Sequence, residues 1–425
     1  IDWLDTLVEE IGVDHNEIVK YRGPLDMTGL NQIADLDFPD LKYPPLRNQV
    51  AWDLRDVDSD SDEELFEAIK RREILLHHPY ESFTSSVVRF LETASEDPNV
   101  LAIKQTLYRT SGDSPIMHAL IEAAQAGKQV LAVIEIRARF DEQANVRWAR
   151  RLEDAGAHVV YGMLNMKTHA KASLVIRKEA DGLALYSHMG TGNYHPKTAR
   201  FYDDLGILSA DQVLGSDLMS LFNQLSGMAT ESNYQRIIVA PKYLREELVS
   251  RIRKEKENHL NGKPSYIRWK LNSLLDEEII DELYDAAKAG VQIDLITRGI
   301  CAFRLSHVGG QKVRIRSILG RFLEHSRIYS FYNDGNPQYF IGSADIMDRN
   351  LNRRIETLVL VKNQDHMDLL NQIIDESFND SFTHWEMNEL DEWVHVKGNS
   401  EAPDGKGASS DYQSHFIKLI TEGNL

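Results

Sequence analysis

Short apolar runs alternate with amphipathic segments from about residue 98 onward. Residues 100–104 and 130–136 are apolar and rich in β-branched side chains, as expected of buried strands. Between them, Ile116, Ala119 and Ala123 fall on one face of a helix that would end at Gly127. Strands joined through helices predict α/β domains with mixed, mostly parallel sheets.

The same pattern of helix, glycine and strand occurs twice. Residues 119–130 resemble residues 282–293, and a histidine motif follows each copy. The first motif is His169-Ala170-Lys171, and the second is His325-Ser326-Arg327. Because many helices end at glycine, the repeat gains its force from the shared histidine motif. The simplest interpretation is two related α/β domains that each contribute one histidine.

Composition divides the chain into four segments. Residues 1–55 have no clear pattern beyond an extended, proline-bearing stretch at 39–45, and the acidic run at 56–62 is typical of a solvated linker. We expect the first α/β domain at 56–236 and the second at 237–395. Residues 396–425 would form a C-terminal tail, with loop composition up to about residue 411 and a short helix after it.

Charge and composition narrow the classes of function. The 425 residues are 42% hydrophobic and 27% charged, which is ordinary for a globular protein. The formal net charge of −18 argues against a general binder of nucleic acids or membrane surfaces, so a polyanionic substrate would need cations gathered at one site. No apolar run is long enough for a spanning helix, no basic leader begins the sequence, and the single cysteine, Cys301, cannot form an internal disulfide. We therefore expect a cytoplasmic protein.

The two histidine motifs carry the candidate chemistry. On a strand, His169 and Lys171 would lie on the same face, about 7 Å apart. A neutral imidazole is a competent nucleophile toward phosphorus, and a neighbouring cation can hold the attacked phosphate. A loop of small residues follows each motif, at 190–193 and 342–345. The N–H groups of such loops can approach phosphate oxygens, and Asn193 or Asp345 can orient an imidazole.

The paired layout resembles the phospholipase D superfamily. In that superfamily two histidines face each other across a pseudo-twofold axis; one attacks phosphorus and the other handles the leaving-group proton. The phospholipase motif also carries an aspartate after the lysine, but Ile176 and Tyr332 stand at the corresponding positions of this chain. A phospholipase D-like phosphodiesterase is therefore kept as an alternative.

A second resemblance covers more of the chain, from about residue 40 to about residue 390. Seven segments are similar to the phosphohistidine-type polyphosphate kinase family: residues 75–83, 103–110, 138–145, 167–171, 190–194, 320–327 and 342–351. The P-loop motif of the other polyphosphate kinases, Gly-x4-Gly-Lys-Ser/Thr, is absent from the sequence. The resemblance implies two phospholipase D-like domains, preceded in residues 1–55 by the remnant of a dimerising domain.

The resemblance also implies an activity. It is the reversible transfer of the γ-phosphate of ATP to inorganic polyphosphate through a phosphohistidine, with Mg²⁺. His169 resembles the histidine that is phosphorylated, and His325 resembles a second histidine close to the nucleotide that serves as a general acid or base. Lys171 and Arg327 complete the two catalytic motifs.

Further residues match the family's binding positions. Tyr202 and Arg298 match contacts to ATP, with Tyr202 stacking on the base. Arg109 and Arg139 match the family's magnesium site; because a guanidinium has no lone pair to donate, we expect them to reach the ion through phosphate oxygens. Phosphate contacts are also expected from Asn193, Arg349, Arg353 and Arg354. A channel for a linear polyanion would be lined by the cations among these residues together with the two catalytic motifs, namely Arg109, Arg139, Lys171, Arg327, Arg349, Arg353 and Arg354.

The expected partners are ATP or ADP and inorganic polyphosphate, with no nucleic acid and no transmembrane segment. The family resemblance also suggests a homo-oligomer, in the cytoplasm or peripheral to a membrane. A fragment that binds polyanions without catalysis is the remaining alternative, and the presence of both His169 and His325 argues against it.

Overall fold

The chain divides after Leu46 into a short N-terminal unit, Ile1–Leu46, and a large unit, Arg47–Leu425. This computed structural model describes residues 3–12, 18, 22–23, 26–57, 62–108, 113–136, 142–163, 166–229, 233–309, 312–398 and 411–422. In the described part of the N-terminal unit lie α1 (Trp3–Ile11), α2 (Leu30–Ala34) and the 3₁₀ turn η2 (Pro39–Leu41). The start of the stretch predicted as extended is therefore a 3₁₀ turn.

Residues 47–55, which composition grouped with the N-terminal region, belong to the large unit. Gln49 pairs with Glu81 in an isolated parallel bridge, and the 3₁₀ turn η3 (Trp52–Leu54) follows. Ala51 and Leu54 are buried in the first hydrophobic core.

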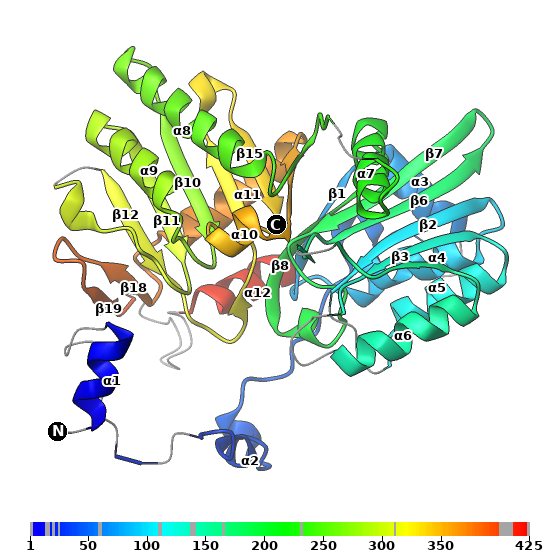
Figure 1. The fold of residues 1–425 in the computed structure, drawn as a ribbon, viewed down its shortest axis with the longest axis horizontal. Helices are drawn as coiled ribbons and strands as arrows, with labels where there is room; N and C mark the ends of the chain where they lie inside the picture. Colours follow the sequence, from blue (N-terminus) through cyan, green and yellow to red (C-terminus); the bar gives the residue numbers. More distant parts are fainter. Residues whose placement is uncertain are drawn as a thin grey trace. The chain divides into compact units, whose positions relative to one another are not determined.

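The first half of the large unit is a mixed sheet covered by helices (Figure 1). Its strands lie in the order β1-β8-β7-β6-β2-β3-β4. Their bounds are β1 (Ile74–His78), β2 (Val100–Leu107), β3 (Gln129–Ile134), β4 (His158–Val160), β6 (Ala172–Glu179), β7 (Gly182–Gly190) and β8 (Tyr202–Ser209). The helices are α3 (Asp62–Arg71), α4 (Arg89–Glu96), α5 (Pro115–Gln125), α6 (Glu142–Asp154) and α7 (Gln212–Leu225), with the π-helical turn η4 (Thr84–Val88) and the 3₁₀ turn η5 (Thr198–Arg200).

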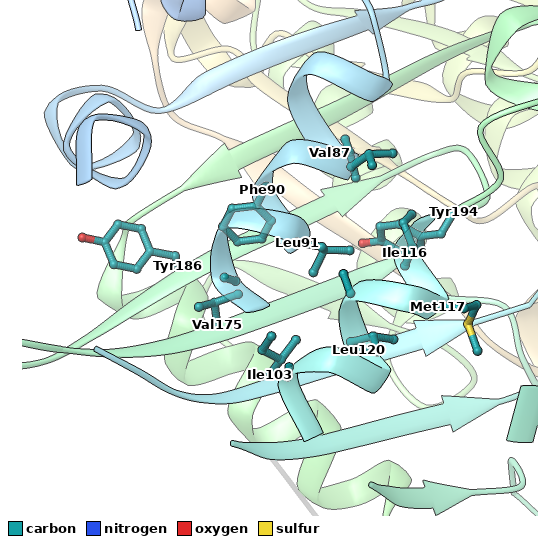
Figure 2. Close-up of a cluster of buried hydrophobic side chains, with 14 of the residues drawn as sticks. Val87, Phe90, Leu91, Ile103, Ile116, Met117, Leu120, Val175, Tyr186 and Tyr194 are labelled. Atoms are coloured by element: carbon teal, nitrogen blue, oxygen red, sulfur yellow. The ribbon is translucent and has the colours of Figure 1, made fainter. Parts of the chain in front are cut away.

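The core of this half lies between the sheet and helices α4 and α5. Figure 2 shows Phe90 of α4 and Ile116 of α5 in one cluster with Ile103 of β2, and all three are fully buried. Tyr186 of β7 belongs to the same cluster, whereas its neighbour Leu185 packs directly against Gly215 of α7 on the other face of the sheet. The sheet is therefore buried on both faces.

The second half is a similar sheet in the order β9-β17-β15-β14-β10-β11-β12-β18-β19. Its strands are β9 (Ile237–Val239), β10 (Tyr266–Leu271), β11 (Gln292–Thr297), β12 (Val313–Ser317), β14 (Ile328–Phe331), β15 (Gln338–Gly342), β17 (Thr357–Val361), β18 (His384–Met387) and β19 (Trp393–Val396). The helices are α8 (Leu244–Leu260), α9 (Glu277–Ala289), α10 (Asp348–Asn352) and α11 (Gln364–Ser377), with 3₁₀ turns η6 (Leu305–His307) and η7 (Asn333–Gly335). Helices α8 and α9 share a core with Trp269 and Leu295 of the sheet.

Local signals set the ends of the two repeated helices. The side chain of Ser114 accepts a hydrogen bond from the N–H of Met117 at the start of α5, and Asp276 does the same for Ile279 at the start of α9. Helix α9 ends at Gly290, which has φ +106°, a conformation that favours glycine. The two predicted units, in which a helix ends at a glycine and a strand follows, are therefore confirmed as α5–β3 and α9–β11.

The two sheets also have the same topology, which confirms the predicted duplication. The order β8-β7-β6-β2-β3-β4 corresponds to β17-β15-β14-β10-β11-β12, and β1 and β9 extend equivalent edges. Within each sheet, parallel pairing is limited to β2-β3-β4 and to β10-β11-β12. The sheets are mixed as predicted, but the other ladders within them are antiparallel, in contrast to the mostly parallel sheets expected. The reason is that the long crossover connections, which parallel strands require, stop after β4 and β12.

Short strands join the two halves. β13 (Leu323–Glu324) of the second half pairs with β8 of the first, and β5 (Lys167–Thr168) of the first half pairs with β16 (Arg354–Ile355) of the second. Because His325 follows β13 and His169 follows β5, both histidine motifs lie where the halves meet.

The segment predicted as a C-terminal tail contains helix α12 (Tyr412–Glu422), so the predicted terminal helix is confirmed. Its residues Tyr412, Gln413 and Phe416 are buried against the rest of the large unit. Among the helices of the described residues, none has both the length and the apolar character needed to cross a bilayer.

Candidate active site

His169 lies in the link between β5 and β6, held by the second half of the molecule. Its backbone N–H and that of Ala170 both donate to the carbonyl of Ile355, at 2.9 Å. Its Nδ1 lies 2.8 Å from Oε2 of Glu356, which is fully buried. The ring of Tyr108 packs edge-on against the imidazole, with centroids 4.8 Å apart. The imidazole is thus fixed in orientation, and Nε2 is the ring nitrogen that Glu356 leaves available.

The surroundings of His169 favour the neutral ring. Burial lowers the pKa of His169 well below its usual value, and the charges of Lys171 and Arg354 lower it further. His325 contributes in the same direction, so the two histidines belong to one electrostatic environment. A neutral imidazole that donates Nδ1–H to a carboxylate presents a lone pair at Nε2.

Lys171 is buried beside His169. Its Nζ donates to the carbonyl of His169 at 2.5 Å and lies 5.5 Å from the centre of the Tyr108 ring. Burial lowers the pKa of Lys171 well below its usual value, and Glu356 opposes that effect. The motif was predicted to lie on a strand, but residues 169–171 fall in the link before β6.

His325 repeats this arrangement with the halves exchanged. Its backbone N–H donates to the carbonyl of Asp203, and its Nδ1 lies 2.7 Å from Oδ1 of Asp204. The hydroxyl of Thr191 donates to the same oxygen at 2.5 Å. Burial lowers the pKa of His325, and Asp204 acts against that shift.

Arg327 is a buried cation held in place by Asp345. The guanidinium Nη2 lies 2.9 Å from Oδ2 of Asp345, and Nε lies 3.3 Å from Oδ1, so the pair is bidentate. Although burial alone would raise the pKa of Asp345, Arg327 holds it at about 2. The remaining Nη1 donates to the carbonyl of His325 at 2.6 Å and lies 3.3 Å from its Nε2. A fixed positive charge therefore lies next to the second imidazole.

Each half thus orients the histidine of the other half through a carboxylate. Asn193 and Asp345 were expected to take this role, and that expectation is wrong. Asp345 pairs with Arg327, and Asn193 makes no contact with an imidazole among the hydrogen bonds of the described residues. The orienting groups, Asp204 and Glu356, were missed. A usable signal existed, because Asp204 within β8 and Glu356 just before β17 occupy equivalent positions of the repeat, and an apolar run follows each.

The two predicted nucleotide contacts lie close to His325. The ring of Tyr202 is 5.0 Å from the imidazole, measured between centroids. Nε of Arg298 donates to Oδ1 of Asn272 at 2.7 Å and to the carbonyl of Glu324 at 2.5 Å. Tyr202 and Arg298 therefore both lie beside His325 and the strand that precedes it.

The remaining predicted phosphate contacts that the structure describes lie at different distances from the two histidines. Arg354 lies 3.8 Å from Glu356 at the centre, whereas Arg353 is exposed and pairs with Asp348, and Arg349 is exposed on α10. Asn193 is half-buried, and its Oδ1 is buried without a hydrogen-bond partner. Arg109 and Arg139 lie outside the described residues.

No group of three or more histidine, cysteine, aspartate or glutamate side chains in the described ranges could hold a metal ion. The described residues therefore do not fit a magnesium ion held by the protein alone. An ion that arrives on the phosphates of a nucleotide would need no such group, because Mg²⁺ is commonly bound through substrate phosphates.

Two α/β halves that share one core topology, with a pair of carboxylate-held histidines between them, have the phospholipase D-like fold that the sequence resemblance implied. Phosphatidylserine synthase of Haemophilus influenzae shares this fold with a TM-score of 0.50 over 85% of this chain and 98% of its own, at 8% identity. Polyphosphate kinase of Porphyromonas gingivalis superposes with a TM-score of 0.83 at 30% identity, covering 99% of this chain and 63% of that one.

Sequence comparison identifies the family. Residues 64–231 match the family described as polyphosphate kinase C-terminal domain 1, and residues 237–405 match polyphosphate kinase C-terminal domain 2. The chain belongs to the polyphosphate kinase family.

Two curated relatives show how far the similarity extends. The polyphosphate kinase of Streptomyces coelicolor is 53% identical over 392 residues, which cover 92% of this chain and 52% of the relative. That of Mycobacterium avium is 47% identical over 416 residues, covering 98% and 54%. The chain therefore spans about half the length of the curated relatives it matches.

Proposed function

We propose that this chain is a polyphosphate kinase that transfers the γ-phosphate of ATP to inorganic polyphosphate, reversibly, through a phosphohistidine at His169. Family membership supports the reaction class. The observation that carries the assignment of the nucleophile is the 2.8 Å contact between Nδ1 of His169 and the buried carboxylate of Glu356. This contact leaves the lone pair at Nε2 in a ring that burial keeps neutral. His325 is held in the same way, but its Nε2 lies 3.3 Å from Nη1 of Arg327, a donor that would occupy the lone pair.

In the first step Nε2 of His169 attacks the γ-phosphorus of ATP. The N–P bond forms as the bond to the bridging oxygen of ADP breaks, and ADP leaves with that electron pair. Nδ1 keeps its proton, so the phosphorylated ring gains positive charge, which the carboxylate of Glu356 stabilises. In the second step a terminal oxygen of polyphosphate attacks the phosphorus, the N–P bond breaks, and the ring returns to its neutral form.

The buried cations would supply most of the catalysis. Phosphoryl transfer depends on positioning and on neutralising the charge of the phosphoryl oxygens. Lys171, Arg327 and Arg354 lie around the two histidines and are suited to that task. His325, oriented by Asp204, would act as the general acid or base for the leaving or entering oxygen.

The nucleotide is proposed to bind on the His325 side of the centre. Tyr202 would stack on the base and Arg298 would contact the phosphates, with Mg²⁺ arriving as part of the nucleotide substrate. Asn193, Arg349 and Arg353 are proposed as outer contacts of the polyphosphate chain, together with Arg109 and Arg139. Self-association of the chain stays a prediction from family resemblance, and light scattering would measure it.

The decisive experiment incubates the chain with ATP labelled at the γ-phosphate. We expect an acid-labile, base-stable phosphoprotein that is lost in His169→Ala and kept in His158→Ala, a matched change at an exposed histidine of β4. Adding unlabelled polyphosphate should discharge the label into polymer. Label that persists in His169→Ala would refute the assignment of the nucleophile. Release of labelled phosphate to water alone would instead support the phosphodiesterase-like alternative.

A further inference from the structure

Helix α12 reaches the strand that precedes His325 through one fully buried side chain, Gln413. Its Oε1 accepts from the N–H of Phe322 at 2.7 Å, and its Nε2 donates to the carbonyl of the same residue at 2.9 Å. The same Nε2 also donates to Oε1 of Glu324 at 2.6 Å. The amide thus pairs with the backbone of Phe322, directly before β13, and with the side chain of Glu324 within it.

The approach of Gln413 depends on Gly320. A Cβ atom placed on Gly320 would lie 2.5 Å from Oε1 of Gln413 and 2.8 Å from its Cδ, well inside van der Waals contact. Because three hydrogen bonds hold the amide, it could not move aside without losing them. The segment before β13 is therefore shaped to admit this side chain.

Glu324 connects Gln413 to a buried cluster of charges. Nζ of Lys270 lies 2.7 Å from Oε2 of Glu324 and 3.2 Å from Oδ1 of Asp203. Asp203 also contacts Nε2 of His77 at 2.9 Å and accepts from the hydroxyl of Ser326 at 2.5 Å. The cluster therefore lies next to His325 and next to the carboxylate that orients it. Glu324 directly precedes His325, and Asp203 directly precedes Asp204.

Phe416 of α12 covers this cluster. The ring of Phe416 packs 5.8 Å from His77 and 6.0 Å from Tyr80, between centroids, and Tyr80 packs 5.7 Å from Phe322. Excluding water strengthens the interactions between the charges beneath. Helix α12 (red in Figure 1) therefore both closes the cluster and bonds to the strand.

Strand β13 is otherwise held by β8 and by the side chains of Lys270 and Arg298. It is two residues long, and its ladder with β8 joins Leu323 to Tyr202 and Glu324 to Asp203. Arg298 adds one hydrogen bond to the carbonyl of Glu324. A strand this short needs lateral partners to hold the residue that follows it in place.

We propose that α12 is a positioning element of the active site, in which Gln413 sets the place of His325 relative to Asp204 and His169. The proposal rests on the function proposed above for His325. Gln413 touches no reacting atom and would act only through β13. The helix predicted as part of a C-terminal tail would then be required for full catalytic rate.

The test uses the full chain with Gln413→Met, which keeps the length of the side chain and removes its hydrogen bonds. We expect the kcat for polyphosphate synthesis to fall about ten- to hundredfold, as small displacements of a catalytic group do, with the KM for ATP changing less than about threefold. We also expect the ring pKa of His325, measured by NMR on labelled histidine, to rise toward its usual value as water enters. In a His325→Ala background the change should cost no further activity.

The matched control is Tyr412→Phe, which removes a buried hydrogen bond from α12 to the carbonyl of Ile373 in α11 rather than to β13. It should leave kcat and the His325 titration unchanged. Should Gln413→Met fail to fold, Gly320→Ala is the variant to compare with Tyr412→Phe instead, because its added methyl group would crowd the amide of Gln413.

Three results would overturn the proposal: an unchanged His325 titration, an equal loss in Tyr412→Phe, or the same loss in the His325→Ala background. A wild-type chain that forms no phosphohistidine would refute the proposed function instead. The NMR titration would still decide the role of Gln413 in that case.

Discussion

The replacement Glu356→Gln tests how the active site selects the reactive nitrogen of His169. In the wild type, Oε2 of Glu356 faces Nδ1 of the imidazole, while Oε1 accepts from Nδ2 of Asn350 at 2.7 Å and lies 3.8 Å from Nη1 of Arg354. In the Glu356→Gln variant, the amide oxygen would face Asn350 and Arg354, because both of these side chains are hydrogen-bond donors. The amide nitrogen would then face Nδ1 of His169. Since that nitrogen carries hydrogens, the ring would have to accept at Nδ1 and carry its proton at Nε2.

The expected loss is large. A change from a charged to a neutral hydrogen bond costs about 1–1.5 kcal/mol, or roughly tenfold in rate. Holding the wrong tautomer adds much more, since the comparable Asp→Asn change in serine proteases lowers kcat by about 10⁴. We therefore expect phosphohistidine formation to slow by roughly 10³–10⁴ in Glu356→Gln.

Rapid quenching of the chain with labelled ATP would measure this rate directly. A matched control is Glu255→Gln on α8, where burial raises the pKa of the carboxyl to about 7, so that an amide is a mild replacement. The control should phosphorylate at the wild-type rate. If Glu356→Gln also stayed within threefold of wild type, the carboxylate would not select the tautomer, and the argument would be refuted.

Three further predictions concern pH, nucleotide binding and stability. Because the pKa of His169 lies well below its usual value, the rate of phosphohistidine formation should not decline between pH 7.5 and 6.5; an inflection at 6.5 or above would contradict this. The unfolded chain binds protons below about pH 6.5 that the folded ring does not, so the free energy of unfolding should decrease as the pH falls from there. Tyr202→Ala should weaken ATP binding by about 1–3 kcal/mol in calorimetry if the ring stacks on the base, whereas Phe201→Ala, at a neighbouring ring that is 63% exposed, should not. Asp345→Asn leaves a buried guanidinium without its acid and should lower the free energy of urea unfolding by about 3–5 kcal/mol, against less than about 1 kcal/mol for Asp334→Asn in an exposed pair.

Much of the architecture could be predicted from the local pattern of apolar and polar residues. The helix ending at Gly290 and the strand after it repeat the unit ending at Gly127, and the two sheets share one topology. Such elements are encoded by the 3.6-residue and two-residue periods and by capping residues, which act between neighbours in the chain. The antiparallel hairpins were missed because a strand that is buried on both faces does not alternate between apolar and polar residues. Its sequence therefore does not indicate whether it pairs in a parallel or an antiparallel direction.

The sequence alone determined which residue types could do phosphoryl chemistry, namely His169 and His325 with a cation two positions after each. Only the tertiary structure decided how each imidazole is held. Glu356 lies 187 residues from His169 and Asp204 lies 121 residues from His325, and each pair forms only when the halves meet. Gln413 reaches Phe322, directly before β13, in the same way, from 91 residues away. Contacts of this range depend on how whole sheets pack, and no short stretch of sequence contains that information.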